Sequence, residues 1–240
     1  MKLTQHYSSS SGNFYVVESS TGKRLLIECG VRWSRIQKAL NFDLSNIECC
    51  LLSHSHKDHS HAIKEVLQAG IDVYSSEGTF ESLGIHTNRR AKVVADKTLI
   101  RLAHFDILCF GVNHDANEPL GFIVRDLNSN EFLLFATDTS HIVQKFNLPF
   151  SIIAIECSFD KDLLQERVDT GKINEALAKR LLSSHMEKGN TIKYIAEHCN
   201  LTKCTQIHLL HLSSENIDAA KAKREVEEKF YIETAIRSHS

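Results

Sequence analysis

One short segment of the sequence, 53–59, contains four side chains that could bind metal ions: His54, His56, Asp58 and His59. It follows an apolar run, 47–52, that is typical of a short buried strand, and a helical pattern follows it. His54 and His56 alternate as side chains on one side of an extended segment do. Asp58 and His59 then turn elsewhere, which suits two metal ions side by side. Imidazole and carboxylate groups bind zinc, manganese or iron without any thiolate. The alternative, a polar loop that is only rich in histidine, is disfavoured by so dense a set of ligands.

Three later residues could complete a metal site. His114 opens a loop after an apolar run, Asp138 ends another such run, and His211 ends a third. All three therefore lie where a sheet delivers side chains to one edge. Each also has an ordinary explanation by itself: a loop histidine, a helix cap and a hydrogen-bonded core histidine, respectively.

The elements that must position these side chains are short strands and amphipathic helices. Strands are expected at 1–7, 14–18, 23–29, 47–52, 71–74, 91–96, 100–110, 120–125, 132–136, 152–157, 206–210 and 231–236. Helices are expected at 33–40, 61–69, 77–83, 162–185 with an interruption near residue 170, 191–198 and 217–229. The mixture predicts an α/β protein, with at least one strand–helix–strand unit.

Composition indicates an ordinary globular protein. The chain has 240 residues, of which 42% are hydrophobic and 24% charged, and no linker is visible, so we expect a single domain over residues 1–240. The net charge is −2 with neutral histidines, whereas proteins that bind long polyanions generally show a basic stripe. The basic clusters at 89–92 and 221–224 are small, and the second lies among glutamates as on a solvated helix face.

The cysteines and the hydropathy bear on location. Seven cysteines, an odd number, and no recognisable signal peptide predict reduced thiols and a cytoplasmic protein. The sequence contains no Cys-x-x-Cys pair, so it gives no indication of a structural zinc site. No apolar run is long enough to span a membrane. The remaining histidines, including His239, are assigned no role.

The pattern His54-x-His56-x-Asp58-His59, with His114, Asp138 and His211, resembles the metallo-β-lactamase superfamily. The resemblance implies an α/β fold of four layers, an αββα sandwich, which periodicity alone does not reach. It also implies that His54, His56 and His114 hold one ion. Asp58, His59 and His211 would hold the other, and Asp138 would bridge the two.

Several loops narrow the resemblance to one branch. The segments 10–13 (Ser-Ser-Gly-Asn), 113–115 (Asn-His-Asp) and 211–216 look like loops of WalJ/YycJ-type proteins, and the last is similar to a loop of tRNase Z. His185 stands where tRNase Z-like enzymes place a histidine near the leaving group, and an imidazolium can donate a proton to a departing alkoxide. A surface histidine is the alternative. β-Lactamases commonly have a bridging cysteine, and no cysteine here has that context, which argues against lactam hydrolysis.

These features predict a dinuclear metal-dependent phosphodiesterase with two divalent ions, zinc or manganese. Its catalytic residues would be Asp58, Asp138 and His185. The slight negative charge and the lack of a basic arm favour a cyclic mononucleotide as substrate, opened to the linear monophosphate as in phage anti-Pycsar enzymes, in the host cytosol if the protein is phage-encoded.

Other functions stay open. The main alternative is an exonuclease of the WalJ/YycJ type, or a tRNase Z-like nuclease, acting on single-stranded nucleic acid. Ester or thioester hydrolysis uses the same ligands, and a metal-stabilised binding protein is the non-enzyme hypothesis, which the complete ligand set disfavours. The resemblance also implies a homodimer.

Overall fold

A computed structural model describes residues 1–237, and His239 lies outside them. The chain divides into two compact units, one comprising residues 1–111 and 116–131 and the other residues 112–115 and the chain from residue 132 onward. We describe each unit by itself. The expectation of a single domain over residues 1–240 stays a prediction.

The first unit contains a six-stranded sheet with the strand order β1-β2-β3-β4-β5-β6. Its strands are β1 (Lys2–Ser9), β2 (Gly12–Glu18), β3 (Arg24–Ile27), β4 (Ile47–Leu51), β5 (Val73–Ser75) and β6 (Ala91–Val93). β1 to β3 form the expected antiparallel hairpins, and β3 to β6 run parallel. Three further strands pair antiparallel: β7 (Leu99–Arg101), β8 (Phe105–Gly111) and β9 (Leu120–Asp126).

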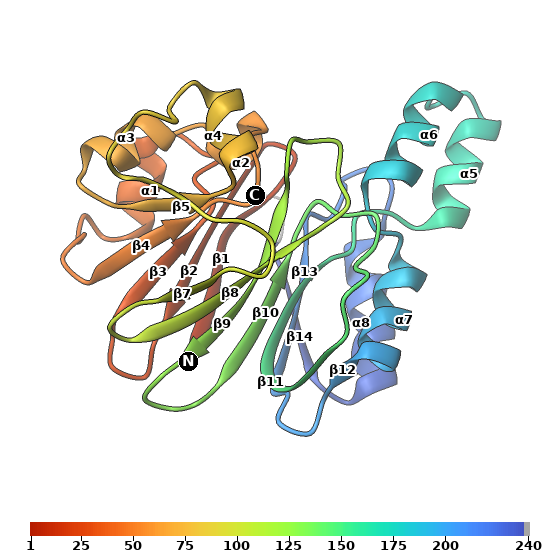
Figure 1. The fold of residues 1–240 in the computed structure, drawn as a ribbon. Helices are drawn as coiled ribbons and strands as arrows, with labels where there is room; N and C mark the ends of the chain where they lie inside the picture. The colour runs from red at the N-terminus through yellow and green to blue at the C-terminus, as the bar shows by residue number, and fades with distance from the viewer. Residues whose placement is uncertain (238–240) are drawn as a thin grey trace. The chain divides into compact units, whose positions relative to one another are not determined.

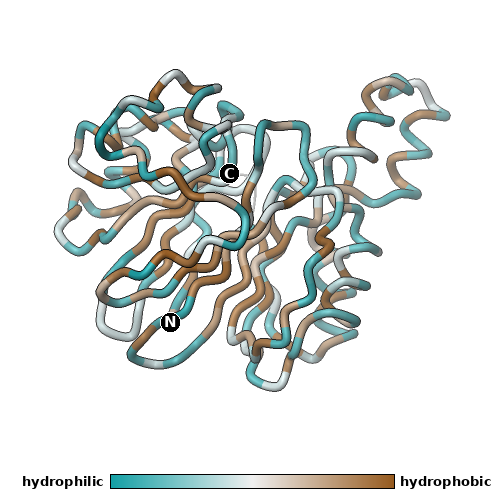
Figure 2. Tube along the Cα trace, in the orientation of Figure 1, coloured by the Kyte–Doolittle hydropathy of each residue, from teal (hydrophilic) through white to brown (hydrophobic). Residues whose placement is uncertain are grey.

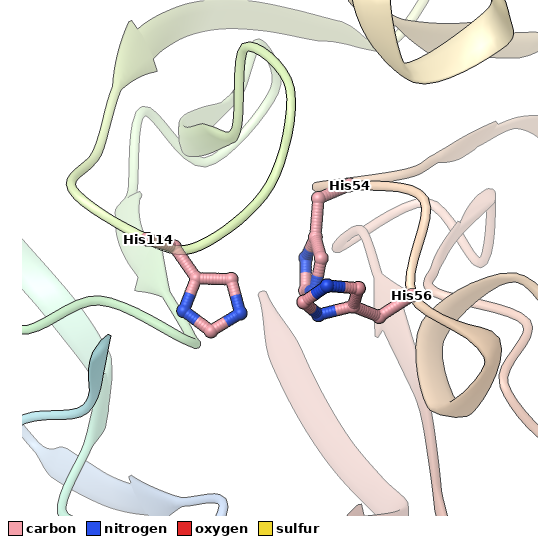
Figure 3. Close-up of side chains that lie close together, drawn as sticks. All are labelled: His54, His56 and His114. Carbon is pink, nitrogen blue, oxygen red and sulfur yellow. The ribbon is translucent and has the colours of Figure 1, made fainter. Parts of the chain in front are cut away.

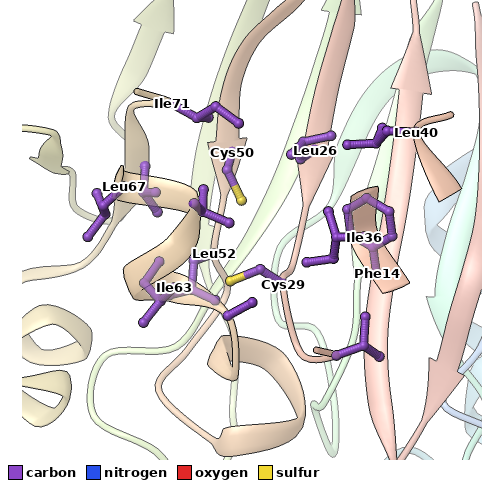
Figure 4. Packing of buried hydrophobic residues seen from close by; sticks show 14 of the residues in the cluster. Phe14, Leu26, Cys29, Ile36, Leu40, Cys50, Leu52, Ile63, Leu67 and Ile71 are labelled. Carbon is purple, nitrogen blue, oxygen red and sulfur yellow. The ribbon is translucent and has the colours of Figure 1, made fainter. Parts of the chain in front are cut away.

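Four helices belong to the first unit: α1 (Trp33–Ala39), α2 (Lys57–Ser60), α3 (Ile63–Gln68) and α4 (Glu77–Leu83). They lie near one another in Figure 1, and α1, α3 and α4 bury their apolar sides against β2, β3 and β4. In this core, Ile36 of α1 and Val66 of α3 pack with Leu26 of β3, and all three are fully buried. Figure 4 shows the same core with Phe14 and Leu52. Strand β2 is buried on both faces, as expected for a sheet that forms an inner layer.

The second unit contains four parallel strands in the order β10-β11-β13-β14. These are β10 (Phe132–Ala136), β11 (Phe146–Glu156), β13 (Gln206–Leu210) and β14 (Glu233–Ile236), and the short β12 (Cys199–Asn200) also pairs with β11. Its helices are α5 (Lys161–Asp169), α6 (Glu175–Ser184), α7 (Lys188–His198) and α8 (Ala219–Phe230). α5 and α6 form a helical hairpin around Phe159 and Leu164. Figure 2 shows hydrophobic residues concentrated along the strands of the chain.

The predicted α/β class is confirmed, since the structure has two sheets flanked by helices. Several predicted elements differ in their bounds; β11, for example, begins at Phe146 rather than at residue 152, and β6 ends at Val93 rather than at residue 96. The run 100–110 is divided into β7 and β8 by a turn at 102–104, in which Leu102 N–H donates to the Phe105 carbonyl. The helix expected at 61–69 is preceded by the separate turn α2. Among the described residues, no helix is both long and apolar enough to cross a membrane.

Candidate metal centre

The histidine-rich segment of the first unit follows β4, as its sequence predicts. His54 and His59 are fully buried, whereas His56 is partly exposed. The ring of His54 lies 4.7 Å from that of His56 and 4.2 Å from that of His59, between centroids. Figure 3 shows the neighbouring rings of His54 and His56. Ser53 Oγ lies 2.8 Å from His54 Nδ1 and fixes the orientation of that imidazole.

A buried carboxylate, Glu28, supports this segment from the end of β3. Its side chain is fully buried, and its Oε2 lies 3.5 Å from His59 Nδ1. Its Oε1 accepts a hydrogen bond from the Ser53 amide. A carboxylate next to one ring nitrogen orients the imidazole, as in carboxylate–histidine–metal arrangements. Glu28 thus positions a candidate ligand and the strand end that carries the others.

The turn between β1 and β2 contacts the same segment. Asn13 Nδ2 lies 3.0 Å from His59 Nε2 and 3.2 Å from the Asp58 carbonyl oxygen, which accepts its hydrogen bond. The Gly30 amide in turn donates to the Asn13 carbonyl. The Ser-Ser-Gly-Asn turn is therefore more than a hairpin connection, because it holds the Asp58–His59 pair in place.

In the second unit, the carboxyl ends of parallel strands gather acidic groups and imidazoles. β10, β11 and β13 are neighbours, so residues that follow them meet at one edge of the sheet. Asp138, Glu156, His185 and His211 each offer a ligand atom there, all within 4.8 Å of one another. This edge is where the sequence predicted Asp138 and His211.

Asp138 presents its two carboxylate oxygens to two different histidines. Oδ1 lies 2.9 Å from His211 Nδ1, and Oδ2 lies 3.5 Å from His114 Nε2. His114 Nδ1 donates to the Ser184 carbonyl at 2.8 Å, which directs Nε2 toward Asp138. The Asp138 carboxylate thus lies between two of the candidate ligands, His211 and His114.

His185 is held by a second buried carboxylate, Glu156, at the end of β11. His185 Nδ1 donates to Glu156 Oε1 at 2.6 Å. Glu156 is fully buried and also accepts a hydrogen bond from the Thr139 amide. The alternative drawn from the sequence was a surface residue that begins a helix. In the structure His185 follows the last turn of α6, and its side chain is largely buried. The hydrogen bond to Glu156 thus occupies Nδ1 of His185, and Nε2 is its other ring nitrogen.

The pKa values of the groups in the second unit follow from burial and charge. Burial disfavours the protonated form of His185, but the negative charge of Glu156 outweighs it and raises the pKa of His185. His211 is similar, since Asp138 and Glu156 overcome its burial and raise its pKa to about 10. Burial prevails at His114 and lowers its pKa. In return, the two imidazoles outweigh burial and lower the pKa of Glu156.

Three site residues have left-handed backbone conformations that side chains rarely adopt. The φ angles are +64° at Glu28, +45° at Asp138 and +52° at His211. Glu28 and His211 come directly after a buried strand, and Asp138 comes two residues after one. At each position the chain turns to direct a side chain to the sheet edge. Such strain is costly and tends to occur at functional sites.

The structure thus brings the candidate ligands of each unit together: His54, His56, Asp58 and His59 in the first, and His114, Asp138 and His211 in the second, with His185 beside them. The assignment of the seven ligands to two ions stays a prediction. The sequence analysis missed Glu28 and Glu156. The gathered imidazole and carboxylate groups are suited to divalent metal ions.

Known proteins resemble this chain in sequence and in fold. Exodeoxyribonuclease YycJ of Bacillus anthracis is 23% identical over 222 residues, which cover 87% of this chain and 81% of that protein. The anti-Pycsar protein Apyc1 of Bacillus phage 010DV004 is 40% identical over 63 residues, which cover 25% of this chain and 24% of that protein. The metallo-beta-lactamase fold protein YhfI of Bacillus subtilis superposes with a TM-score of 0.75 at 16% identity, covering 98% of this chain and 96% of that one.

These likenesses confirm the predicted αββα sandwich and the resemblance to YycJ-type and anti-Pycsar proteins. A sequence model of the metallo-beta-lactamase superfamily, a family of hydrolases, matches residues 9–182. The chain belongs to this superfamily.

Proposed function

We propose that this protein is a metal-dependent phosphodiesterase that cleaves nucleotide phosphodiester bonds with two divalent ions. The proposed ligands are His54, His56, Asp58, His59, His114, Asp138 and His211. The observation that carries the proposal is the buried Asp138 carboxylate, whose oxygens face His211 and His114 separately. All seven donors are oxygen or imidazole nitrogen atoms, which suit zinc or manganese.

The protein's own residues would position the substrate and move a proton. Two ions, when bound, would lower the pKa of a water molecule and offset the negative charge on phosphoryl oxygens. His185, whose pKa Glu156 raises, would donate a proton from Nε2 to the departing sugar oxygen. Glu156 would hold the imidazole by its hydrogen bond to Nδ1. Glu28 would orient His59.

A cyclic mononucleotide is the first candidate substrate, as the sequence predicts. It carries a single phosphate, so it needs the ions, a stacking side chain and a closed pocket rather than an extended basic surface. The local likeness to Apyc1, 40% over 63 residues, supports this candidate.

Single-stranded nucleic acid is the second candidate. The likeness to YycJ, whose name describes an exodeoxyribonuclease, extends over 87% of this chain. A specific observation also favours it, because exposed cations adjoin the Asp58 segment on the first unit. A nucleic-acid strand requires phosphate contacts beyond the metal ligands.

The test is to incubate the purified protein with zinc or manganese and three substrates: cyclic mononucleotides, single-stranded DNA and single-stranded RNA. The double variant His54→Ala/His56→Ala is expected to fold and to lose turnover of every one of them. Full activity in this variant, or no turnover of any substrate by the wild-type protein, would contradict the proposal. The homodimer and the cytoplasmic location stay predictions, and light scattering on the purified protein measures the first.

A further inference from the structure

A pocket on the first unit is lined by cations and hydroxyl groups that the proposed reaction does not use. Its volume is about 500 Å³. It is lined by Ser10, Ser11, Gly30, Val31, Arg32, Arg35, Lys57, Asp58 and His61. We call it the cationic pocket. It comprises the β1–β2 turn, the loop after β3, the start of α1 and the α2 turn.

The charges of the cationic pocket are not balanced within the protein. Arg32, Arg35 and Lys57 are exposed, and within residues 1–237 no carboxylate forms an ion pair with any of them. Other cations among the described residues do form such pairs, for example Arg24 with Asp43 and Arg90 with Asp72. The pocket has one carboxylate, Asp58, and it is a proposed metal ligand. Three cations without a paired carboxylate around one hollow favour an anion as its occupant.

The walls of the cationic pocket are rigidly connected to the metal-binding segment. A Cβ atom built on Gly30 would lie 1.6 Å from the Asp58 carbonyl oxygen, so the loop after β3 packs directly against α2. The Cys29 amide donates to the His59 carbonyl, and the Ala62 amide donates to the Cys29 carbonyl. The guanidinium carbon of Arg35 lies 5.8 Å from the centre of the Tyr7 ring, which supports that side chain from below. Because of these contacts the backbone that carries the cations keeps a fixed position relative to Asp58.

We propose that the cationic pocket binds a phosphate group of a nucleic-acid strand, next to the phosphodiester that is cleaved. This rests on the proposed function and, of its two candidate substrates, favours the nucleic-acid strand over the cyclic mononucleotide. Arg32 and Arg35 supply forked donors suited to phosphate oxygens, Lys57 supplies a point charge, and the hydroxyls of Ser10 and Ser11 supply further donors. A cyclic mononucleotide has one phosphate, which the metal ligands would hold, so the pocket selects for a strand with at least two.

The test uses the double variant Arg32→Gln/Arg35→Gln. A matched control is Lys2→Gln/Lys38→Gln, which removes the same charge from exposed positions of the first unit outside the pocket. Binding of a fluorescent single-stranded oligonucleotide is measured by anisotropy in EDTA, over a series of salt concentrations. We expect the pocket variant to bind about tenfold more weakly or worse, and its log–log salt slope to fall by about 0.7 for each phosphate contact removed. The control is expected to match the wild type.

A second measurement compares turnover of the oligonucleotide with that of bis(p-nitrophenyl) phosphate, which contains a single phosphodiester. The ratio of the two kcat/KM values is expected to fall about tenfold in the pocket variant, because only the strand reaches the pocket. Oligonucleotides with and without a 5′-phosphate identify the bound group. If the pocket variant is impaired only on strands with a 5′-phosphate, the pocket binds the terminal phosphate. If it is equally impaired on strands with and without a 5′-phosphate, the pocket binds an internal phosphodiester.

The proposal is overturned if the pocket variant binds the oligonucleotide like the wild type, or if the control loses as much affinity. Thermal unfolding of both variants checks for a folding defect. All four substituted positions are exposed, so both variants are expected to unfold at the wild-type temperature. Should the wild type hydrolyse no phosphodiester with any metal, the proposed function fails, but the anisotropy measurement still decides whether the pocket binds phosphate.

Discussion

Glu156 and His185 form a hydrogen-bonded pair at the edge of the second unit's sheet, with 2.6 Å between Oε1 and Nδ1. The carboxylate is fully buried at the end of a parallel strand, and the imidazole follows a helix. The negative charge raises the pKa of the imidazole, and the imidazole lowers that of the carboxylate. The pair therefore favours a protonated imidazole beside Asp138 and His211.

Removing His185 should slow the reaction without abolishing binding. A leaving-group acid acts mainly in the transition state, so we expect His185→Ala to lower kcat by about 100-fold or more while KM changes little. Glu156→Gln should lower kcat less. Steady-state kinetics on the preferred substrate measures both, with the exposed His86→Ala as control. A good leaving group, such as p-nitrophenolate, departs without a proton. On a substrate with such a group, His185→Ala should therefore lower kcat much less. An equal loss on both substrates would argue against proton donation.

Replacement of Asp138 should change metal content as well as rate. A neutral amide bridges two ions poorly, so we expect Asp138→Asn to lose at least one bound ion per chain and most activity, and Asp138→Ala to lose slightly more. Elemental analysis of the purified variants gives the metal content. The exposed Asp169→Asn serves as control. Wild-type metal content and rate in Asp138→Asn would show that this carboxylate does not bridge.

The buried Glu28 should set metal affinity although it is not a proposed ligand. Removal of a carboxylate that orients a ligating histidine typically weakens metal affinity by about 10- to 100-fold. We therefore expect Glu28→Gln to bind metal about 10-fold or more weakly, as measured by competition with a chromophoric chelator. The exposed Glu18→Gln is the control. Unchanged affinity in a folded Glu28→Gln protein would rule out this role.

His208 should make the fold sensitive to acid. Burial lowers its pKa to about 4, against an opposing effect of Glu233. The unfolded chain, with a histidine pKa of about 6.5, binds a proton that the folded chain does not, so stability is lost as the pH falls from about 6.5 toward 4. The contribution is up to about 3 kcal/mol of unfolding free energy. Denaturant titrations at several pH values should show a flatter dependence in His208→Gln, whereas His86→Gln should follow the wild type.

The sequence was sufficient to predict the candidate ligands, because dense histidine spacing and strand-end positions are local properties. His54 and His56 lie side by side, as their alternation implied. The position of Asp138 after β10 also agrees with the apolar run that precedes it. The four-layer arrangement came from resemblance, since the packing of sheets depends on contacts between residues far apart in the chain.

Glu28 and Glu156 were missed because a single glutamate at the end of an apolar run has many explanations. Both occur in the tripeptide Ile-Glu-Cys, which appears a third time at residues 47–49. The first two glutamates are fully buried beside histidines of the site, whereas Glu48 is partly exposed and pairs with His104. The tripeptide therefore signals an acidic group near a strand end, but only tertiary structure shows which of the three supports a metal ligand.

The tight packing of Gly30 against Asp58 has a consequence for how this protein can diversify. Position 30 admits no side chain without displacing a proposed metal ligand. Arg32 and Arg35, only a few residues further on, extend into solvent. Position 30 is therefore constrained by the proposed metal site. Positions 32 and 35 can change, and such changes would alter substrate preference. Descendants of such a sequence could acquire new substrates while inheriting the hydrolytic centre intact.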